Sequence, residues 1–289
     1  MPRRCALSLT SRESSEIDAA NAGGKQPVVF VHGLWLLPSS WGHWRQTFED
    51  AGYATLAPGW PDDPETVTEA RAHPEVFAGK KVQAVTDHHL EVVKALNTRP
   101  ALVGHSFGGL IVQKLAGEGV AEATVSIDPA PGRGVLPLPL SALKSSFPVL
   151  NNPANARRAV TLTPDQFRYG WTNNLDDEES AVLYDEYHVA APGAPLFQAA
   201  FGNVNPGSET RVDYETAGRG PLLVVSGEKD HTVPHAISYA AYKKHRKNPG
   251  VTEFHEIPGR GHSLTIDHGW PEVARVALDF VGRFAPASP

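Results

Sequence analysis

A serine lies at a junction between a predicted strand and a predicted helix. Ser106 is the central residue of residues 104–108, whose sequence is GHSFG. The apolar residues 101–103 precede this segment, and apolar residues at helical spacing, beginning with Leu110, follow it. A G-x-S-x-G segment that ends a buried strand and opens a helix is typical of a nucleophile elbow, which exposes the serine on a sharp turn. The alternative is a turn serine without a chemical role.

Two further polar residues follow predicted strands late in the chain. Asp230 comes after the mostly apolar residues 221–227, and His262 comes after residues 252–257, which alternate apolar and polar side chains. Open α/β sheets place their ligand crevice at the carboxyl ends of strands, where both residues and the serine would lie. The chain order serine, aspartate, histidine is the one expected for a nucleophile elbow on such a sheet. We therefore expect Ser106, Asp230 and His262 to converge.

The acid and the base each have an alternative in the sequence. Asp128 follows the predicted strand at residues 123–127 and would also lie at a carboxyl strand end, so it competes with Asp230. His268 competes with His262 because it lies in the same loop. Among the other histidines, His89 lies on an apolar helix face and is expected in the core. His32 follows the first predicted strand and is expected to brace the adjacent loop by hydrogen bonding.

Predicted strands and helices alternate along most of the chain, but one segment interrupts the pattern. The alternation over residues 26–130 and 217–289 predicts a parallel sheet with helices on both faces. Residues 131–216 contain helix starts without core strands, including a capping-box sequence at residues 163–166. We expect residues 131–216 to form a helical lid that excludes water and shapes an apolar pocket. The polar residues 1–25 are expected to form a mobile N-terminal tail.

Four short segments resemble the α/β-hydrolase superfamily, and in particular its group of serine esterases and lysophospholipase-like enzymes. The segments are residues 31–35 (VHGLW), 104–109 (GHSFGG), 227–234 (GEKDHTVP) and 261–262 (GH). The resemblance implies an α/β-hydrolase fold, with a mostly parallel central sheet flanked by helices and an inserted helical lid. Two features depart from the pattern: the stretch before residue 27 is short and polar, and the loop at residues 57–64 is long.

The resemblance also implies a cofactor-free serine hydrolase that acts on carboxylic esters or related acyl substrates through an acyl-enzyme. Ser106 would be the nucleophile, His262 the general base and acid, and Asp230 the orienting acid. The backbone N–H groups of Leu34 and Phe107 would form the oxyanion hole. Three alternatives use the same residues: a perhydrolase or haloperoxidase-type activity, a carbon–carbon hydrolase or lyase, and a ligand-binding or biosynthetic homologue with vestigial hydrolysis.

Composition excludes several other classes of function. The chain of 289 residues has a net charge of −6 and no long basic run, which argues against nucleic acid as a partner. Its single cysteine excludes an internal disulfide, and the absence of zinc-ligand spacing or a phosphate-binding glycine motif predicts neither a metal nor a nucleotide cofactor. No apolar run approaches the roughly 20 residues of a membrane span, and the apolar start is short for a signal peptide. We therefore expect a cytoplasmic protein with a small apolar acyl or ester substrate; a homodimer is left open.

Overall fold

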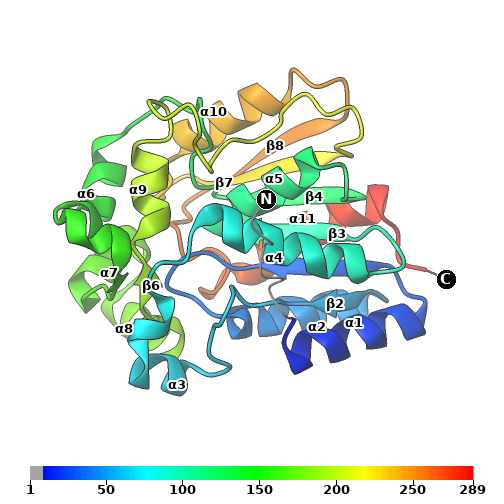
Figure 1. The fold of residues 1–289 in the computed structure, drawn as a ribbon, viewed down its shortest axis with the longest axis horizontal. Coiled ribbons are helices and arrows are strands. Elements are labelled where there is room, and N and C mark those ends of the chain that lie inside the picture. The colour runs from blue at the N-terminus through cyan, green and yellow to red at the C-terminus, as the bar shows by residue number, and fades with distance from the viewer. Residues whose placement is uncertain (1–8, 289) are drawn as a thin grey trace, which may run out of the picture.

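Six parallel strands form the central sheet of the computed structural model, which describes residues 9–288 (Figure 1). Across the sheet they are ordered β2 (Ala54–Leu56), β1 (Pro27–Val31), β3 (Ala101–His105), β4 (Ala123–Ile127), β7 (Leu222–Gly227) and β8 (Thr252–Ile257). All five neighbouring pairs are parallel. The predicted parallel sheet is confirmed. The chain leaves β1 toward β2 on one side and returns to β3 on the other, which creates a switch point between β1 and β3.

The strands are apolar on both faces because helices cover both faces of the sheet. In β1, Val29 and Val31 belong to one core cluster, whereas Val28 and Phe30 belong to the other. The first cluster includes side chains from α1 (Ser11–Gly23), α4 (Val82–Ala95) and α5 (Phe107–Gly117). The second includes side chains from α2 (Gly42–Asp50) and α11 (Trp270–Phe284). Helix α10 (His235–His245) packs against β7 and β8.

Helix α1 shows that the predicted mobile tail is wrong for residues 11–23, while residues 1–8 lie outside the described part of the chain. The buried Glu13 of α1 lies 2.9 Å from Nε2 of the buried His88 in α4. Ile17 is buried in the core cluster beside α4. One apolar side chain and one buried polar pair thus hold the helix in place. Neither produces an amphipathic sequence pattern, which is why residues 10–25 read as an unstructured segment.

Residues 131–216, which we call the insertion, follow β4 and precede β7. They contain the helices α6 (Leu140–Leu150), α7 (Pro164–Gly170), α8 (Asp177–Tyr187) and α9 (Ala194–Ala200), the 3-10 helix η3 (Pro153–Arg157) and the short strands β5 (Ala159–Val160) and β6 (Ala191–Pro192). The capping box predicted at the start of α7 is present, with Thr163 and Gln166 satisfying each other's backbone N–H groups. The helices gather at one end of the sheet (Figure 1).

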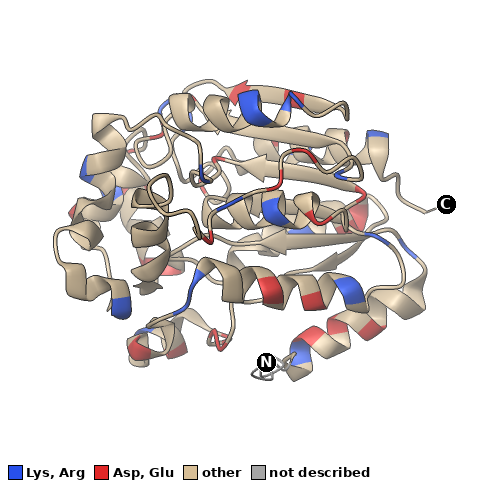
Figure 2. Cartoon of the chain, turned by 45° about the horizontal axis from the view of Figure 1, so that its top comes forward, with Lys and Arg blue, Asp and Glu red and all other residues tan. Residues whose placement is uncertain are grey.

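Three short elements complete the loops that follow β1 and β2. They are η1 (Pro38–Trp41), α3 (Val67–Ala72) and η2 (Pro74–Phe77). Charged side chains of both signs are dispersed over the outer helices and loops, and the central strands carry few of them (Figure 2). Among residues 9–288, no helix combines the length and the apolar composition that crossing a bilayer requires.

Candidate active site

Ser106 occupies a strained turn between β3 and α5. Its backbone has φ 57° and ψ −120°, a region that non-glycine residues seldom adopt and that clusters at functional sites. A Cβ atom added at Gly104 would collide with the carbonyl of Gly108, and one added at Gly108 would collide with the carbonyl of Val31. The Ser106 N–H donates to the carbonyl of Ile127 at 2.9 Å, which ties the turn to β4. Close approach of strand, turn and helix therefore explains both glycines of the motif.

His262 connects Ser106 to Asp230. Its Nε2 lies 3.0 Å from Ser106 Oγ, and its Nδ1 lies 2.6 Å from Asp230 Oδ2. The second Asp230 oxygen accepts hydrogen bonds from the N–H groups of Thr232 and Val233, at 2.6 and 2.8 Å. Because a carboxylate can only accept, Nδ1 of His262 carries a proton and Nε2 remains free to accept the serine hydroxyl. The structure thus brings the three expected residues together from three separate loops.

In the described chain, neither alternative residue hydrogen-bonds to Ser106 or His262. Asp128 is fully buried at the end of β4, where its Oδ1 accepts from the Gly227 N–H at 2.9 Å. Burial, together with the nearby charge of Asp230, raises the pKa of Asp128 well above its ordinary value. His268 lies at the surface, with a side chain that is 65% exposed and Nδ1 2.8 Å from Glu179. The geometry therefore selects Asp230 and His262.

The loop after β1 lies directly against the serine. A Cβ atom added at Gly33 would lie 2.7 Å from the Cβ of Ser106. Leu34 follows Gly33 in this loop, and Phe107 is the first residue of α5, whose N–H has no partner within the helix. In the part of the chain that the structure describes, neither the Leu34 nor the Phe107 N–H donates to a backbone carbonyl. Both N–H groups are therefore unused donors, one in the residue next to Ser106 and one in the loop that packs on Ser106.

A buried polar network fixes this loop from behind. His32 Nδ1 donates to the Gly33 carbonyl at 2.8 Å, which confirms the bracing role expected for His32. His32 Nε2 lies 3.2 Å from Asp63 Oδ2, and Lys80 Nζ lies 2.6 Å from Asp63 Oδ1. Burial opposes the charge of Asp63, but His32 and Lys80 hold the pKa of Asp63 below its ordinary value. The long loop after β2, for which the sequence suggested no role, supplies this carboxylate.

Trp171 of the insertion is a second contact that the sequence did not reveal. Its ring packs edge-on against the His262 ring, with centroids 4.7 Å apart, and its carbonyl accepts from the Ser263 N–H at 3.1 Å. Phe167 stacks on the outer side of Trp171 at 5.5 Å. These aromatic residues therefore shield the histidine and pack the insertion on the core.

An apolar cavity of about 190 Å³ adjoins Ser106. Its walls come from the insertion, including α6 and α9, and from Val233 and Ile237 near the start of α10. Among the described residues that line it, no side chain is charged. Such a cavity suits an uncharged, apolar part of a ligand.

One cluster of potential metal ligands lies close to the serine in residues 9–288. Ligand atoms of His105, Asp128 and His262 are within 4.8 Å of one another, and all three residues are buried. Both ring nitrogens of His262 already face Ser106 and Asp230. A metal ion bound to His262 would therefore displace one of these two contacts.

Solved structures show the same fold at low sequence identity. A monoacylglycerol lipase of Paleococcus ferrophilus aligns with a TM-score of 0.61 and 19% identity, covering 90% of this chain and 98% of its own. A thermophilic esterase from Thermogutta terrifontis aligns with a TM-score of 0.61 and 17% identity, covering 90% of each chain. A methylesterase from Arabidopsis aligns with a TM-score of 0.61 and 13% identity, covering 89% of this chain and 99% of its own. No curated protein sequence matches the chain.

The sequence itself matches a family model over most of its length. The match is to the Alpha/beta hydrolase family and runs over residues 28–276, which include Ser106, Asp230 and His262. This stretch covers the insertion and all of the sheet except Pro27, the first residue of β1. The expected resemblance is therefore confirmed, and the chain belongs to the Alpha/beta hydrolase family.

Proposed function

We propose that the protein hydrolyses carboxylic esters of apolar acyl groups through an acyl-enzyme intermediate. The observation that carries this proposal is the continuous relay from Ser106 Oγ through His262 to Asp230, at 3.0 and 2.6 Å, beside an uncharged cavity. The structural relatives named as an esterase, a methylesterase and a monoacylglycerol lipase support ester substrates as the class. Their identities of 13–19% leave the choice of substrate to the site itself.

In the acylation step, the Ser106 hydroxyl attacks the ester carbonyl carbon while His262 Nε2 takes its proton. Asp230 holds the ring in the required tautomer and stabilises the imidazolium. The Leu34 and Phe107 N–H groups donate to the developing oxyanion. When the tetrahedral intermediate collapses, the carbon–oxygen bond to the alcohol breaks. The alcohol takes the proton from His262, and the acyl group stays on Ser106.

In the deacylation step, a water molecule attacks the acyl-enzyme while His262 Nε2 takes one of its protons. The second tetrahedral intermediate collapses, the acyl–serine bond breaks, and Ser106 recovers a proton from His262. The carboxylic acid leaves the site. One ester and one water molecule thus give one acid and one alcohol, with no other reactant.

The apolar cavity would hold the acyl chain. Its uncharged walls favour a hydrocarbon chain because transferring apolar surface from water is favourable, whereas a carboxylate would lose its hydration there. We assign to the insertion the role of a lid that covers this chain, since α6 and α9 form much of the wall. Water excluded from the cavity would strengthen each hydrogen bond to the oxyanion.

Turnover of p-nitrophenyl butanoate and hexanoate by the purified protein tests the proposal. Ser106→Ala is expected to lower kcat by about 10⁴-fold to 10⁶-fold. A fluorophosphonate probe should label the wild type and fail to label this variant. Ser15→Ala, which changes an exposed serine of α1, is the matched control and should behave as wild type. Full activity in Ser106→Ala would contradict the mechanism.

A further inference from the structure

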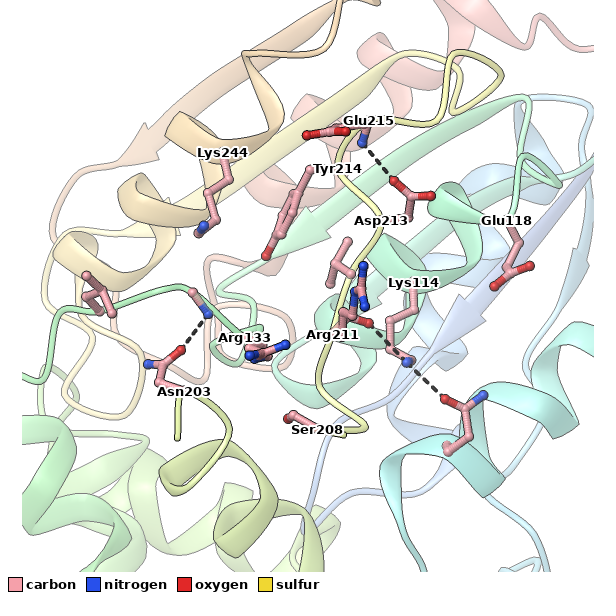
Figure 3. A pocket seen from close by; sticks show the side chains of 14 residues that line it. Lys114, Glu118, Arg133, Asn203, Ser208, Arg211, Asp213, Tyr214, Glu215 and Lys244 are labelled. Atoms are coloured by element: carbon pink, nitrogen blue, oxygen red, sulfur yellow. Dashed lines mark hydrogen bonds between the residues drawn. The ribbon is translucent and has the colours of Figure 1, made fainter. Parts of the chain in front are cut away.

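Figure 3 shows the residues that line a second cavity, of about 970 Å³. Leu136 and Asn203 line both cavities. The side chain of Asn203 accepts from the Gly134 N–H at 2.5 Å and donates to the Val135 carbonyl at 2.9 Å. The segment from Gly134 to Leu136, fastened by Asn203, is therefore the wall between the two cavities. A ligand that crosses this wall would occupy both.

Cationic side chains without acidic partners line the second cavity. Within residues 9–288, Arg133 and Lys244 form no ion pair with a carboxylate, whereas the exposed Arg211 interacts with the charge of Asp213. Arg133 and Lys244 are half-buried, so part of their hydration is lost. Lys114 differs from them because its Nζ already lies within 3.2 Å of three oxygen atoms of the protein. Arg133 donates to the Pro206 carbonyl at 3.2 Å, and Lys244 Nζ lies 5.3 Å from the centroid of the Tyr214 ring. Neither half-buried charge is neutralised by a carboxylate, which suits both to an anionic ligand.

Three acidic residues also line this cavity: Glu118, Asp213 and Glu215. In Figure 3, Glu118 lies on the side of Lys114 away from Lys244, whereas Glu215 lies next to Tyr214. One carboxylate oxygen of Asp213 already accepts the Glu215 N–H at 2.9 Å. Cations still outnumber acids in the lining, and the positive part formed by Arg133 and Lys244 lies next to the wall that this cavity shares with the apolar cavity.

Tyr214 adds an unused hydroxyl to this positive part. Its oxygen is buried and has no hydrogen-bond partner in the described chain, although buried polar atoms almost always have one. A Cβ atom added at Gly132 would lie 2.8 Å from this oxygen, and one added at Gly134 would lie 2.6 Å from Lys244 Nζ. Both groups thus lie against the backbone on either side of Arg133. In Figure 3, Lys244, Tyr214 and Arg133 surround the same space.

We propose that this cavity binds a phosphate group carried by the alcohol or thiol portion of the acyl substrate. A guanidinium, an ammonium and a phenol hydroxyl supply the donors that a phosphate dianion accepts. The acyl chain would fill the apolar cavity at Ser106, and the phosphorylated portion would pass over Leu136 and Asn203 into the polar cavity. This inference rests on the proposed function and narrows its substrates to phosphorylated acyl esters or thioesters.

Two pairs of substrates with the same acyl chain test the inference. One pair is octanoylglycerol and octanoylglycerol 3-phosphate, and the other is octanoyl N-acetylcysteamine and octanoyl coenzyme A. We expect at least one phosphorylated member to have a kcat/KM about tenfold or more above that of its neutral partner. The pair that shows the larger ratio identifies the source of the phosphate.

Variants then locate the effect in the cavity. Arg133→Gln combined with Lys244→Gln should reduce the phosphorylated-to-neutral ratio to about one. Tyr214→Phe, which removes only a hydroxyl without a partner and so should fold normally, should reduce the ratio several-fold through KM. Lys243→Gln is the matched control, because Lys243 is an exposed neighbour of Lys244 on α10. It should keep the wild-type ratio.

Each remaining outcome has a definite meaning. Hydrolysis of the neutral members without any preference for the phosphorylated ones would overturn the inference and leave the proposed ester hydrolysis intact. If the protein hydrolyses none of these four substrates and no p-nitrophenyl ester, the proposed function itself is overturned. A preference that survives in Tyr214→Phe and in the double variant would place the phosphate elsewhere. Acceleration of octanoylglycerol hydrolysis by added glycerol 3-phosphate, with no substrate preference, would make the cavity an effector site and refute the assignment.

Discussion

Asp63→Ala removes the carboxylate that contacts both His32 and Lys80 behind the loop after β1. We expect this change to lower both the stability of the protein and the rate of the reaction. The carboxylate lies 3.2 Å from His32 Nε2 and 2.6 Å from Lys80 Nζ. The side chain of Lys80 is only 7% exposed, so its ammonium would be left almost buried without a partner. Breaking a buried ion pair from one side costs about 3–5 kcal/mol. We expect the free energy of unfolding to fall by about this amount.

The same substitution should also slow the reaction. His32 Nδ1 donates to the Gly33 carbonyl at 2.8 Å, and this carbonyl shares one planar peptide with the Leu34 N–H. Without Asp63 the imidazole keeps its stacking on Trp60 but loses the contact at Nε2, so the orientation of the peptide is less well fixed. Complete loss of one oxyanion donor costs about 3–4 kcal/mol, or about 10²-fold to 10³-fold in kcat. Because Gly33 still packs on Ser106, we expect a partial loss of about 10-fold to 100-fold, with KM nearly unchanged.

Lys80→Met is the matched control. Lys80 contacts the Asp63 oxygen that faces away from His32, so its loss should lower stability while kcat stays within about threefold of wild type. Urea unfolding and p-nitrophenyl butanoate kinetics measure the two effects. Affinity for a trifluoromethyl ketone, whose oxyanion occupies the same site, should fall in Asp63→Ala by the same factor as kcat. Equal losses of kcat in both variants, or an unchanged affinity for the ketone, would refute the bracing argument.

Three further predictions concern the relay, the close contact at the serine and the buried histidines. Asp230→Asn should lower kcat for p-nitrophenyl esters by about 10⁴-fold, whereas Asp128→Asn should lower it less than tenfold. The reverse order would make Asp128, and not Asp230, the orienting acid. Gly33→Ala should lower kcat at least tenfold without preventing folding, since its Cβ would lie 2.7 Å from the serine Cβ; circular dichroism and kinetics check both points. Burial, with a smaller contribution from a nearby charge, lowers the pKa values of His89 and His245 from 6.5 to about 3. As pH falls, these two histidines therefore bind protons in the unfolded chain before they do so in the folded one. The free energy of unfolding should fall by up to about 3 kcal/mol per pH unit between pH 6.5 and pH 3. Urea titrations at pH 7 and 4.5 would detect this loss.

The core strands could be predicted because each is a short apolar run that ends at turn-forming residues. The segments before Ser106 and before Asp128 became β3 and β4, and the residues before Asp230 became β7. Helix α1 carries one local signal that was missed, the capping box of Thr10 and Glu13. Its docking could not be predicted, because it depends on Ile17 and on the contact between Glu13 and a histidine far along the chain. The order of the strands was also beyond the sequence, since pairing across the sheet is decided by contacts between distant segments.

The residues of the candidate site also fall into those that local sequence patterns reveal and those that they do not. Ser106, Asp230 and His262 each follow a recognisable strand, so local patterns sufficed to identify them. Asp63 and Trp171 act through neighbours that only folding brings close: Asp63 reaches a histidine from an earlier strand end, and Trp171 comes from the insertion to pack on His262. The long loop after β2 was the one local sign of the Asp63 contact. No local pattern marked the Trp171 contact.

The choice between the two carboxyls at the strand ends follows from their backbone donors. Asp230 receives two N–H groups on one oxygen and the imidazole on the other, so its charge is well stabilised. Asp128 receives a single N–H, and its other contacts are with the side chains of Asp230 and Ser226. Two adjacent buried carboxylates cannot both ionise at low cost, and burial with the nearby charge of Asp230 raises the pKa of Asp128 well above its ordinary value, which favours its neutral form. A neutral Asp128 is closely imitated by asparagine, whereas a charged Asp230 is not. The unequal losses expected for Asp128→Asn and Asp230→Asn are therefore a direct test of how the two side chains share one negative charge.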